Sequence, residues 1–210
     1  LVGQFFAASL DEIDGITYRR QVPLRMRLGL QQKLQQSAEM LAQEVERFRP
    51  QILHTTTHYV NALVVRAVAE AFDIPWVYEV RGQLADTWAS SRGEWAYHSE
   101  RYKLFNKREA EMARSADAVV TLGTQMQDNL IRAGVDPNKI ALAPNAVGDI
   151  YRDEPMATRD ARTRIGLPLD ADVIGTVTSV VGYEGLDDLL RAAALMLPKN
   201  PKLHVLIAGD

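Results

Sequence analysis

An arginine and a glycine close the most strand-like stretch of the sequence, which runs from Ile74 to Gly82. Its Trp, Val and Tyr residues suit a pleated surface, and helix-like segments on both sides favour a buried parallel strand. In open α/β sheets, ligands bind beyond the carboxyl ends of the strands. Arg81 therefore stands where a guanidinium can reach a phosphate or a sugar hydroxyl, and Gly82 permits close approach.

The segments around this strand must position Arg81, and they alternate in type. Strands are expected at 51–54, 115–122 and 140–144, and helices at 30–48, 61–72, 98–113 and 124–133. A strand, a helix and a strand within about 30 residues make a βαβ unit. The fold class is therefore α/β, with a parallel sheet and flanking helices, while residues 83–97 read as a long polar loop that is functional or mobile.

A second βαβ unit follows an irregular linker at 148–155. It is expected to contain a strand at 173–178, a helix at 186–197 and a strand at 203–208, after a short helix at 159–165. Alone it cannot bury both faces of its sheet, so it would need a partner surface, which could make the protein an oligomer.

The N-terminal segment mixes four arginines (Arg19, Arg20, Arg25 and Arg27) with Val22, Leu24, Met26 and Leu28. This mixture could contact an anionic membrane or a phosphorylated acceptor. The alternative is a solvated loop on the core, which is favoured because the apolar residues do not follow helical spacing.

The composition argues against several classes of protein. A net charge of −3 and a pI near 5.9 argue against a nucleic-acid partner. The sequence has no cysteine and its histidines lack metal-ligand spacing, so disulfides, thiolate metal sites and other metal sites are not expected. Charges interrupt every apolar run before about 18 residues. The expected location is the cytoplasm, where the protein could lie at the inner face of the membrane.

Five segments resemble, in this order, the retaining glycosyltransferases called family 4 or group 1. They are 49–54, 74–82, 116–122, 139–147 and 183–190. That family has the GT-B architecture, in which two Rossmann-like domains face each other across a cleft. The resemblance implies an N-terminal, acceptor-side domain at 1–147 that lacks its first strands, and the start of a donor-side domain at 148–210.

The reaction implied by the resemblance is transfer of a sugar from a nucleotide-diphosphate sugar to a hydroxyl acceptor, with retention of configuration. A carbohydrate or lipid-linked acceptor, as in polysaccharide or glycolipid synthesis, fits the family. The enzyme must stabilise a developing oxocarbenium ion and a departing diphosphate. Family members do this with cationic side chains and helix N-termini, so neither a metal nor another cofactor is expected.

The resemblance also implies roles for single residues. Arg81 takes the place where relatives often carry a histidine close to the reacting sugar, so it is the candidate catalytic residue; the alternative is a structural arginine bonded to loop carbonyls. Gly82 is expected at the same site, and His58 is a candidate for acceptor binding, while His54 reads as a structural histidine at a strand end. Asn145 could touch the donor or cap the hinge between the domains.

Further candidates lie in the expected loop and in the second unit. Backbone N–H groups at Gly185 could face the diphosphate, with Glu184 as a charge at the start of the helix. Trp88 and Trp95 could form a sugar platform, although packing against the core is an equal alternative.

The sequence also departs from the family pattern. The acidic residue of its Pro-Asn-Gly-Val-Asp-like motif is absent from Pro144 to Gly148, and Thr178 replaces a frequent glycine. The glycine-rich loop would precede Leu1 and the donor-gripping glutamates would follow Asp210, so the chain reads as an excerpt that is inactive by itself. A nucleotide-sugar epimerase and a non-catalytic interaction module are the alternatives. The donor sugar, the base and the acceptor stay open.

Overall fold

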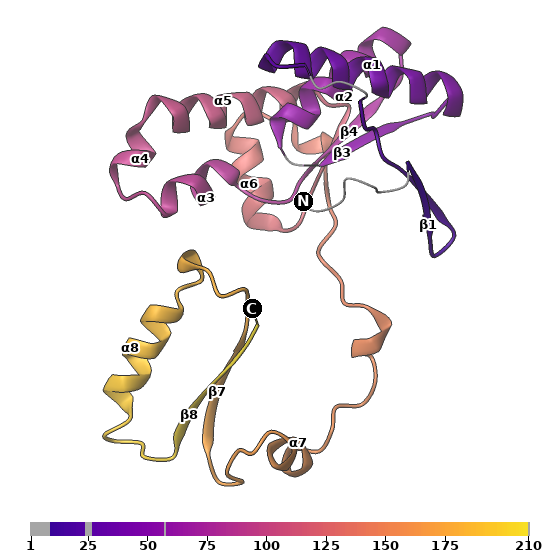
Figure 1. Ribbon diagram of the computed structural model, residues 1–210. Helices are drawn as coiled ribbons and strands as arrows, with labels where there is room; N and C mark the ends of the chain where they lie inside the picture. The colour runs from indigo at the N-terminus through magenta and orange to yellow at the C-terminus, as the bar shows by residue number, and fades with distance from the viewer. Residues whose placement is uncertain (1–8, 24–26, 57, 210) are drawn as a thin grey trace. The chain divides into compact units, whose positions relative to one another are not determined.

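The computed structural model describes residues 9–23, 27–56 and 58–209. The chain divides into two compact units, one formed by residues 1–85 with 100–145 and the other by 86–99 with 146–210. Each unit is treated below by itself (Figure 1).

A β-hairpin opens the described chain. Strands β1 (Leu10–Ile13) and β2 (Ile16–Arg19) pair antiparallel through a two-residue turn. Both turn residues have positive φ, 52° at Asp14 and 76° at Gly15, which is the turn geometry that matches the twist of paired strands. The sequence from Asp14 to Tyr18 is typical of a turn that leads into a short strand, which the structure confirms, whereas β1 was not predicted.

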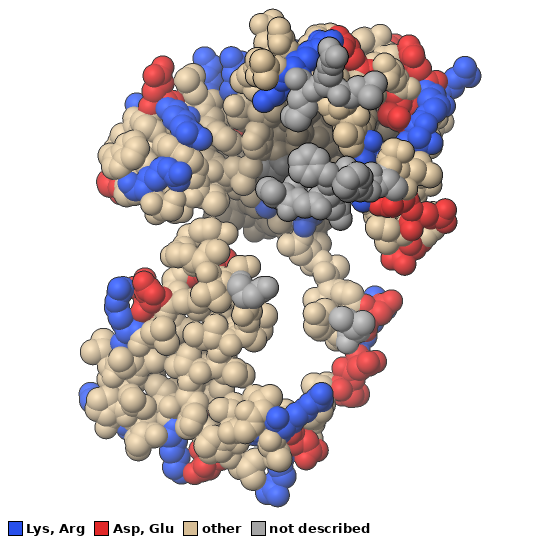
Figure 2. Space-filling model, in the orientation of Figure 1, with Lys and Arg blue, Asp and Glu red and all other residues tan. Residues whose placement is uncertain are grey.

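The arginines near the hairpin lie against carboxylates. Arg19 is 3.8 Å from Glu44, Arg27 is 3.1 Å from Glu39, and Arg20 pairs with Asp11. Residues 24–26, which include the arginine at position 25, lie outside the described residues. On the face drawn in Figure 2, Lys and Arg side chains are interspersed with Asp and Glu. Pairing of this kind neutralises much of the charge that would attract an anionic surface.

The first unit is built on a four-stranded parallel sheet, as the sequence predicts. Its strands run in the order β3 (Leu53–Thr56), β4 (Trp76–Val80), β5 (Ala118–Thr121) and β6 (Ile140–Leu142). The crossovers pass through α2 (Tyr59–Phe72), α5 (Glu100–Ser115) and α6 (Thr124–Arg132). Because every crossover steps the same way across the sheet, the right-handed rule puts these helices on one face. Helix α1 (Leu30–Phe48) packs against α2.

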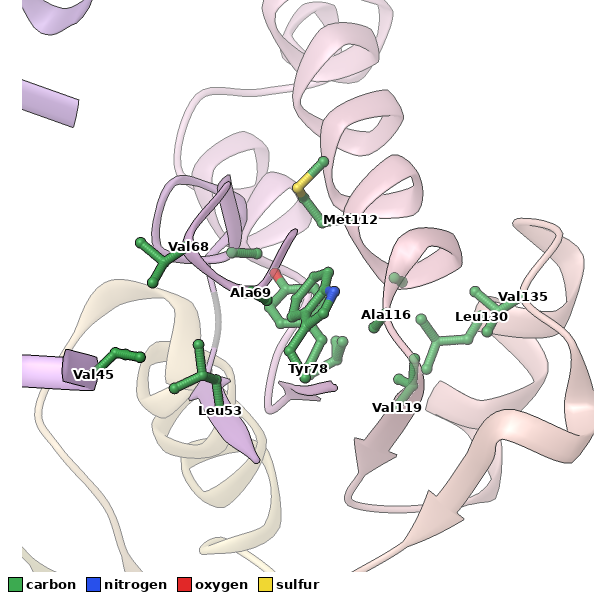
Figure 3. Close-up of a cluster of buried hydrophobic side chains, with 14 residues drawn as sticks. Val45, Leu53, Val68, Ala69, Tyr78, Met112, Ala116, Val119, Leu130 and Val135 are labelled. Carbon is green, nitrogen blue, oxygen red and sulfur yellow. The ribbon is translucent and has the colours of Figure 1, made fainter. Parts of the chain in front are cut away.

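The core lies between the sheet and its helices (Figure 3). Along β4 the buried residues alternate, with Trp76, Tyr78 and Val80 facing the same way. Tyr78, Met112 and Val119 are completely buried, and burying one such apolar side chain contributes roughly 1.5–3 kcal/mol. The opposite face of β4 therefore carries Val77, Glu79 and, one residue beyond the strand, Arg81.

The prediction of a long loop at 83–97 is wrong. The segment contains α3 (Leu84–Ser90) and α4 (Trp95–His98) instead. Ala85 and Ala89, four residues apart, are buried, as is Ala96 in α4. Each helix is too short to show the apolar period clearly, and the polar residues that conceal it lie on the outer faces.

The second unit contains the βαβ arrangement that the sequence predicts. Strands β7 (Asp172–Val177) and β8 (Leu203–Ala208) pair in parallel, and helix α8 (Leu186–Met196) lies between them in the sequence. Helix α7 (Thr158–Arg164) precedes them. Large apolar side chains stay exposed, among them Val177 at 87% and Leu195 at 81%. Turns η2 (Asp149–Tyr151) and η3 (Gly182–Glu184) belong to this unit, whereas turn η1 (Pro137–Lys139) precedes β6 in the first unit.

Candidate functional site

The polar residues at the carboxyl edge of the sheet share one face. Alternation along β4 places Glu79 and Arg81 on the side away from the core. The parallel register pairs His54 with Val77 and Thr56 with Glu79, which brings these β3 residues to the same side. The fold therefore gathers polar groups from two strands at the point where the strands end.

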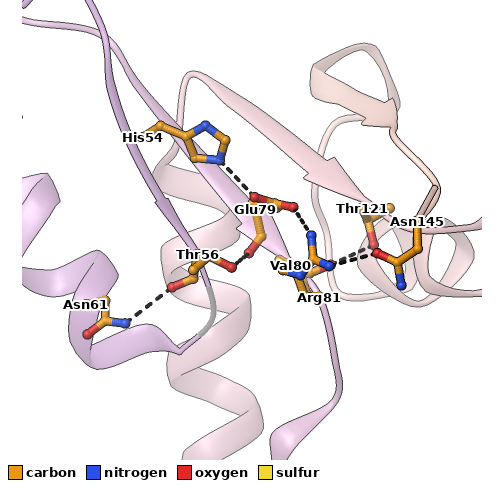
Figure 4. A network of polar contacts seen from close by, with 8 residues as sticks. All are labelled: His54, Thr56, Asn61, Glu79, Val80, Arg81, Thr121 and Asn145. Atoms are coloured by element: carbon orange, nitrogen blue, oxygen red, sulfur yellow. Dashed lines mark hydrogen bonds and ion pairs between the residues drawn. The ribbon is translucent and has the colours of Figure 1, made fainter. Parts of the chain in front are cut away.

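Glu79 is the centre of this group (Figure 4). One carboxylate oxygen accepts a hydrogen bond from Arg81 Nη1 at 2.7 Å, and the other lies 3.2 Å from His54 Nε2. The Glu79 side chain is only 19% exposed, against 48% for Arg81 and 52% for His54. A partly exposed pair of this kind adds about 0.2–1 kcal/mol to stability, so it orders the side chains more than it stabilises the fold.

Arg81 also reaches the chain beyond β6. Its Nη2 donates to Asn145 Oδ1 at 2.7 Å (Figure 4). The intervening strand is fixed by the Thr121 hydroxyl, which donates to the Val80 carbonyl at 3.0 Å. The structure thus brings together Arg81 and Asn145, two candidates that are 64 residues apart in the sequence.

Two further polar residues border the group. The Thr56 hydroxyl donates to the Glu79 carbonyl at 3.3 Å, and Asn61 Nδ2 donates to the Thr56 carbonyl at 3.4 Å (Figure 4). The edge therefore offers a hydroxyl, two amides, a carboxylate and a guanidinium. This mixture of donors and acceptors can bind hydroxyl groups.

His58 has a structural position at the start of α2. Its Nδ1 accepts the Val60 N–H at 3.1 Å as a helix cap. The ring stacks on Tyr59, with centroids 5.2 Å apart, and meets Phe105 edge-on at 5.7 Å. A neutral ring that accepts at Nδ1 carries its proton on Nε2, so a role in acceptor binding would use that N–H.

A partly buried carboxylate also binds the start of this helix. Glu109 on α5 accepts the Tyr59 N–H at 2.8 Å and the Tyr78 hydroxyl. Burial raises the pKa of Tyr78 well above its usual range, and the hydrogen bond and the charge of Glu109 raise it further. Tyr78 is therefore a neutral structural residue.

Gly82 follows Arg81 in open surroundings. A Cβ atom built on Gly82 would meet no heavy atom within 4 Å. Packing within the chain therefore does not require glycine at this position.

The remaining candidates belong to the second unit. Trp88 meets Trp95 edge-to-face with centroids 6.4 Å apart, and the Arg92 guanidinium lies 5.0 Å over the Trp88 ring. Trp95 is 63% exposed, so its indole presents the larger apolar surface. Of the two tryptophans, Trp95 is better placed to stack on a ligand.

Gly185 joins turn η3 to helix α8. Its φ of 73° favours glycine, and its carbonyl accepts the N–H groups of Asp188 and Leu189. Glu184 ends η3, two residues before the first residue of α8, so it precedes the helix start at which it was predicted. Asp187 occupies the first turn of α8 together with Asp188, and both carboxylates oppose an anion at this helix start.

Metal ligands do not gather in the part of the chain that the structure describes: its His, Asp and Glu side chains form no group of three or more that could hold an ion. Within 9–23, 27–56 and 58–209, helices long and apolar enough to cross a bilayer are likewise absent.

Comparison with known proteins assigns the family. The model of the glycosyl transferase 4-like domain matches residues 7–146. The chain belongs to this family of glycosyltransferases.

Curated relatives carry related names. D-inositol 3-phosphate glycosyltransferase of Rhodococcus jostii is 34% identical over 105 residues, which cover 48% of this chain and 23% of that protein. The protein of the same name from Corynebacterium urealyticum is 27% identical over 162 residues, covering 73% of this chain and 37% of its own length. The matches span about a quarter to somewhat over a third of these relatives.

Solved structures share the fold. Sucrose-phosphate synthase from Thermosynechococcus elongatus superposes with a TM-score of 0.73 at 18% identity, covering 98% of this chain and 50% of that chain. HepE of Anabaena, solved in complex with UDP-glucose, gives a TM-score of 0.60 at 16% identity, covering 81% of this chain and 42% of its own. The α/β fold is thus that of GT-B glycosyltransferases.

Proposed function

We propose that the protein takes part in transfer of a sugar from a nucleotide-diphosphate sugar to a hydroxyl acceptor, with retention of configuration. The observation that carries the proposal is the placement of Arg81 at the carboxyl edge of the sheet, held by Glu79 and Asn145. This is the edge at which open α/β sheets bind ligands. Membership of the glycosyl transferase 4-like family supplies the class of reaction.

In this proposal Arg81 is the catalytic residue of the edge. Its guanidinium contacts the transferred sugar or the acceptor hydroxyl, where fixed N–H donors stabilise charge that develops during transfer. Glu79 and Asn145 hold the guanidinium in one orientation before the ligand arrives, which lowers the cost of ordering it. Gly82 leaves room for the ligand beside the backbone.

The donor side of the proposal rests on residues 148–210 as the start of a donor-binding domain. A nucleotide sugar as donor is supported by HepE, which shares the fold and was solved with UDP-glucose. Gly185 is the proposed diphosphate contact through its backbone, although the two carboxylates of the first turn of α8 weaken it. No resident cofactor is proposed.

On the first unit, His58 is proposed to contact the acceptor through Nε2. On the second unit, the tryptophan pair of Trp88 and Trp95 is proposed separately as a surface for a sugar ring. A polysaccharide or lipid-linked acceptor stays the expected class. Contact with a membrane gains little support from the hairpin region, where three arginines lie against carboxylates. Exposed Val177 and Leu195 support a further partner surface on the second unit.

The test uses the complete gene product with a panel of nucleotide sugars and hydroxyl acceptors. We expect release of the nucleoside diphosphate that depends on one donor, and NMR of the product should show the anomeric configuration of that donor. Absence of both turnover and nucleotide-sugar binding across the panel would contradict the proposal. Conversion of the sugar nucleotide without any acceptor would indicate an epimerase instead.

A further inference from the structure

The charge balance at the carboxyl edge is close to zero in the described residues. The strand ends and the residues that follow them carry one carboxylate, Glu79, and one permanent cation, Arg81. Their side chains touch at 2.7 Å. The other polar side chains of the edge are Thr56, Asn61, Asn145 and His54, and the hydroxyl and the two amides carry no charge.

Glu79 restricts what can approach Arg81. A phosphate that binds the guanidinium must come within a few ångströms of the Glu79 carboxylate, whose charge repels it. The carboxylate cannot easily leave, because its second oxygen lies 3.2 Å from His54 and the side chain is only 19% exposed. Repulsion at this depth is screened less than at the open surface.

A sugar hydroxyl meets no such penalty. It can donate to a carboxylate oxygen and accept from a guanidinium N–H at the same time, whereas a phosphate dianion only accepts. Glu79, Arg81 and Asn145 therefore present alternating acceptors and donors, and 48% of the Arg81 side chain is exposed to receive a ligand. This pattern suits neighbouring hydroxyl groups on a ring.

We propose that the group bound at Arg81 is an uncharged polyhydroxyl ring and not a phosphate, and that Glu79 is the residue that sets this specificity. The inference rests on the proposed function, since it names the class of ligand at the same site. The names of the curated relatives contain a phosphorylated cyclitol, D-inositol 3-phosphate, so inositol and its phosphate make a suitable pair of probes.

The experiment follows the Arg81 Nε–H signal by NMR in the complete gene product, assigned with Arg81→Lys. Matched probes are myo-inositol against inositol 3-phosphate and glucose against glucose 6-phosphate, with inorganic phosphate alone as a further probe. In the wild type we expect the signal to move with a neutral probe and to respond weakly to the phosphorylated ones. In Glu79→Gln, binding of the phosphorylated probes should tighten by about tenfold or more.

Two variants control this result. Glu70→Gln removes the same charge from α2, where Glu70 pairs with Arg66 at 2.7 Å, and this helix end lies toward the amino edge of the sheet. It should leave phosphate binding unchanged. Glu79→Asp keeps the charge and should still discriminate against phosphate, which provides a readout if Glu79→Gln folds poorly.

Three results would overturn the inference. They are wild-type binding of phosphorylated probes as tight as in Glu79→Gln, an equal gain in Glu70→Gln, and an Arg81 signal that responds to none of the probes. Release of nucleoside diphosphate from a nucleotide sugar is measured separately, so a glycosyltransferase with a phosphate at Arg81 is distinguishable from a protein without transferase activity.

Discussion

At the scale of single residues, the arginine at the end of β4 is held by side chains from two parts of the chain. Glu79 lies two residues before it on the same face of the strand, and Asn145 arrives from beyond β6. Holding a long cationic side chain in one orientation removes rotamer freedom before a ligand binds. Arg81 is therefore oriented before a ligand arrives, as the proposed contact with the ligand requires.

Gly82 provides a test of ligand approach at this scale. Gly82→Ala should change stability by less than about 0.5 kcal/mol because the added methyl meets open space. It should nevertheless raise KM severalfold, because the methyl occupies the path of the ligand. The measurement is a urea unfolding curve together with steady-state kinetics on the complete gene product.

Gly185→Ala is the contrasting variant for Gly82. With φ at 73° it should lose about 1 kcal/mol or more of unfolding free energy. An unchanged KM in Gly82→Ala would show that Gly82 does not lie beside the bound ligand.

The raised pKa of Tyr78 predicts that the protein loses stability at alkaline pH. Its pKa is raised in the folded state, so the unfolded chain releases this proton first, from about pH 10. The linked stability is fully present below that pH and is lost as the pH rises above it. Tyr78→Phe should cost about 1–2 kcal/mol at pH 7, through the bond to Glu109, and should reduce the alkaline loss.

Urea unfolding between pH 7 and pH 11 measures both effects of Tyr78→Phe. Tyr183, 59% exposed, supplies the control Tyr183→Phe, which should leave stability and its pH dependence unchanged. An alkaline decline as steep in Tyr78→Phe as in the wild type would contradict this account of Tyr78.

At the scale of elements, the residue that caps the end of α2 has a left-handed backbone conformation. Asp73, the C-cap, has φ 54° and ψ 48°, and its N–H donates to the Ala69 carbonyl. The left-handed region is adopted most easily by glycine. This cap turns the chain from the helix into β4 and so contributes to placing Arg81.

Asp73→Gly should therefore stabilise the protein, by about 0.5–1 kcal/mol. Thermal and urea unfolding measure the change. Glu70→Gly, in the last turn of the same helix, is the matched control and should lose about 1 kcal/mol. A loss of stability in Asp73→Gly would show that the aspartate side chain stabilises the cap by another route.

The sequence predicted the elements with strong local signals and missed those without them. β4 was found because its Trp, Val and Tyr residues suit a strand and Arg81-Gly82 close it. Helices α3 and α4 were missed because polar residues conceal their apolar positions, which made the segment read as a loop. The contact of Arg81 with Asn145 depends on the order of the strands, which local patterns do not encode. Glu79 was overlooked as a functional residue, although a carboxylate inside a largely buried strand requires a partner and was itself a signal.

At the scale of the whole molecule, the chain separates into two units of different character. The first has one continuous core, whereas the second has a two-stranded sheet with exposed apolar side chains. Residues 146–157, which open the longer segment of the second unit, are irregular apart from turn η2, and residues 146–149 and 151–157 are all exposed. Such an irregular connection is the expected site of proteolytic cleavage.

Limited digestion with trypsin tests this organisation. The side chain of Arg152 is 75% exposed and lies within the connection. We expect cleavage after Arg152 before any cleavage within α5, and mass spectrometry of the early fragments identifies the sites. Earlier cleavage inside α5 would contradict a stable first unit.

The most direct test of the central claim compares Arg81→Ala with Arg108→Ala in the complete gene product. Both arginines are about half exposed, and Arg108 pairs with Glu111 at 2.9 Å as Arg81 pairs with Glu79. We expect kcat/KM for nucleoside diphosphate release to fall at least about a hundredfold in Arg81→Ala, the scale of losing one stabilising donor. Arg108→Ala should stay within about twofold of the wild type, with both melting temperatures close to it. Equal activity in the two variants would contradict a role for Arg81 in the reaction.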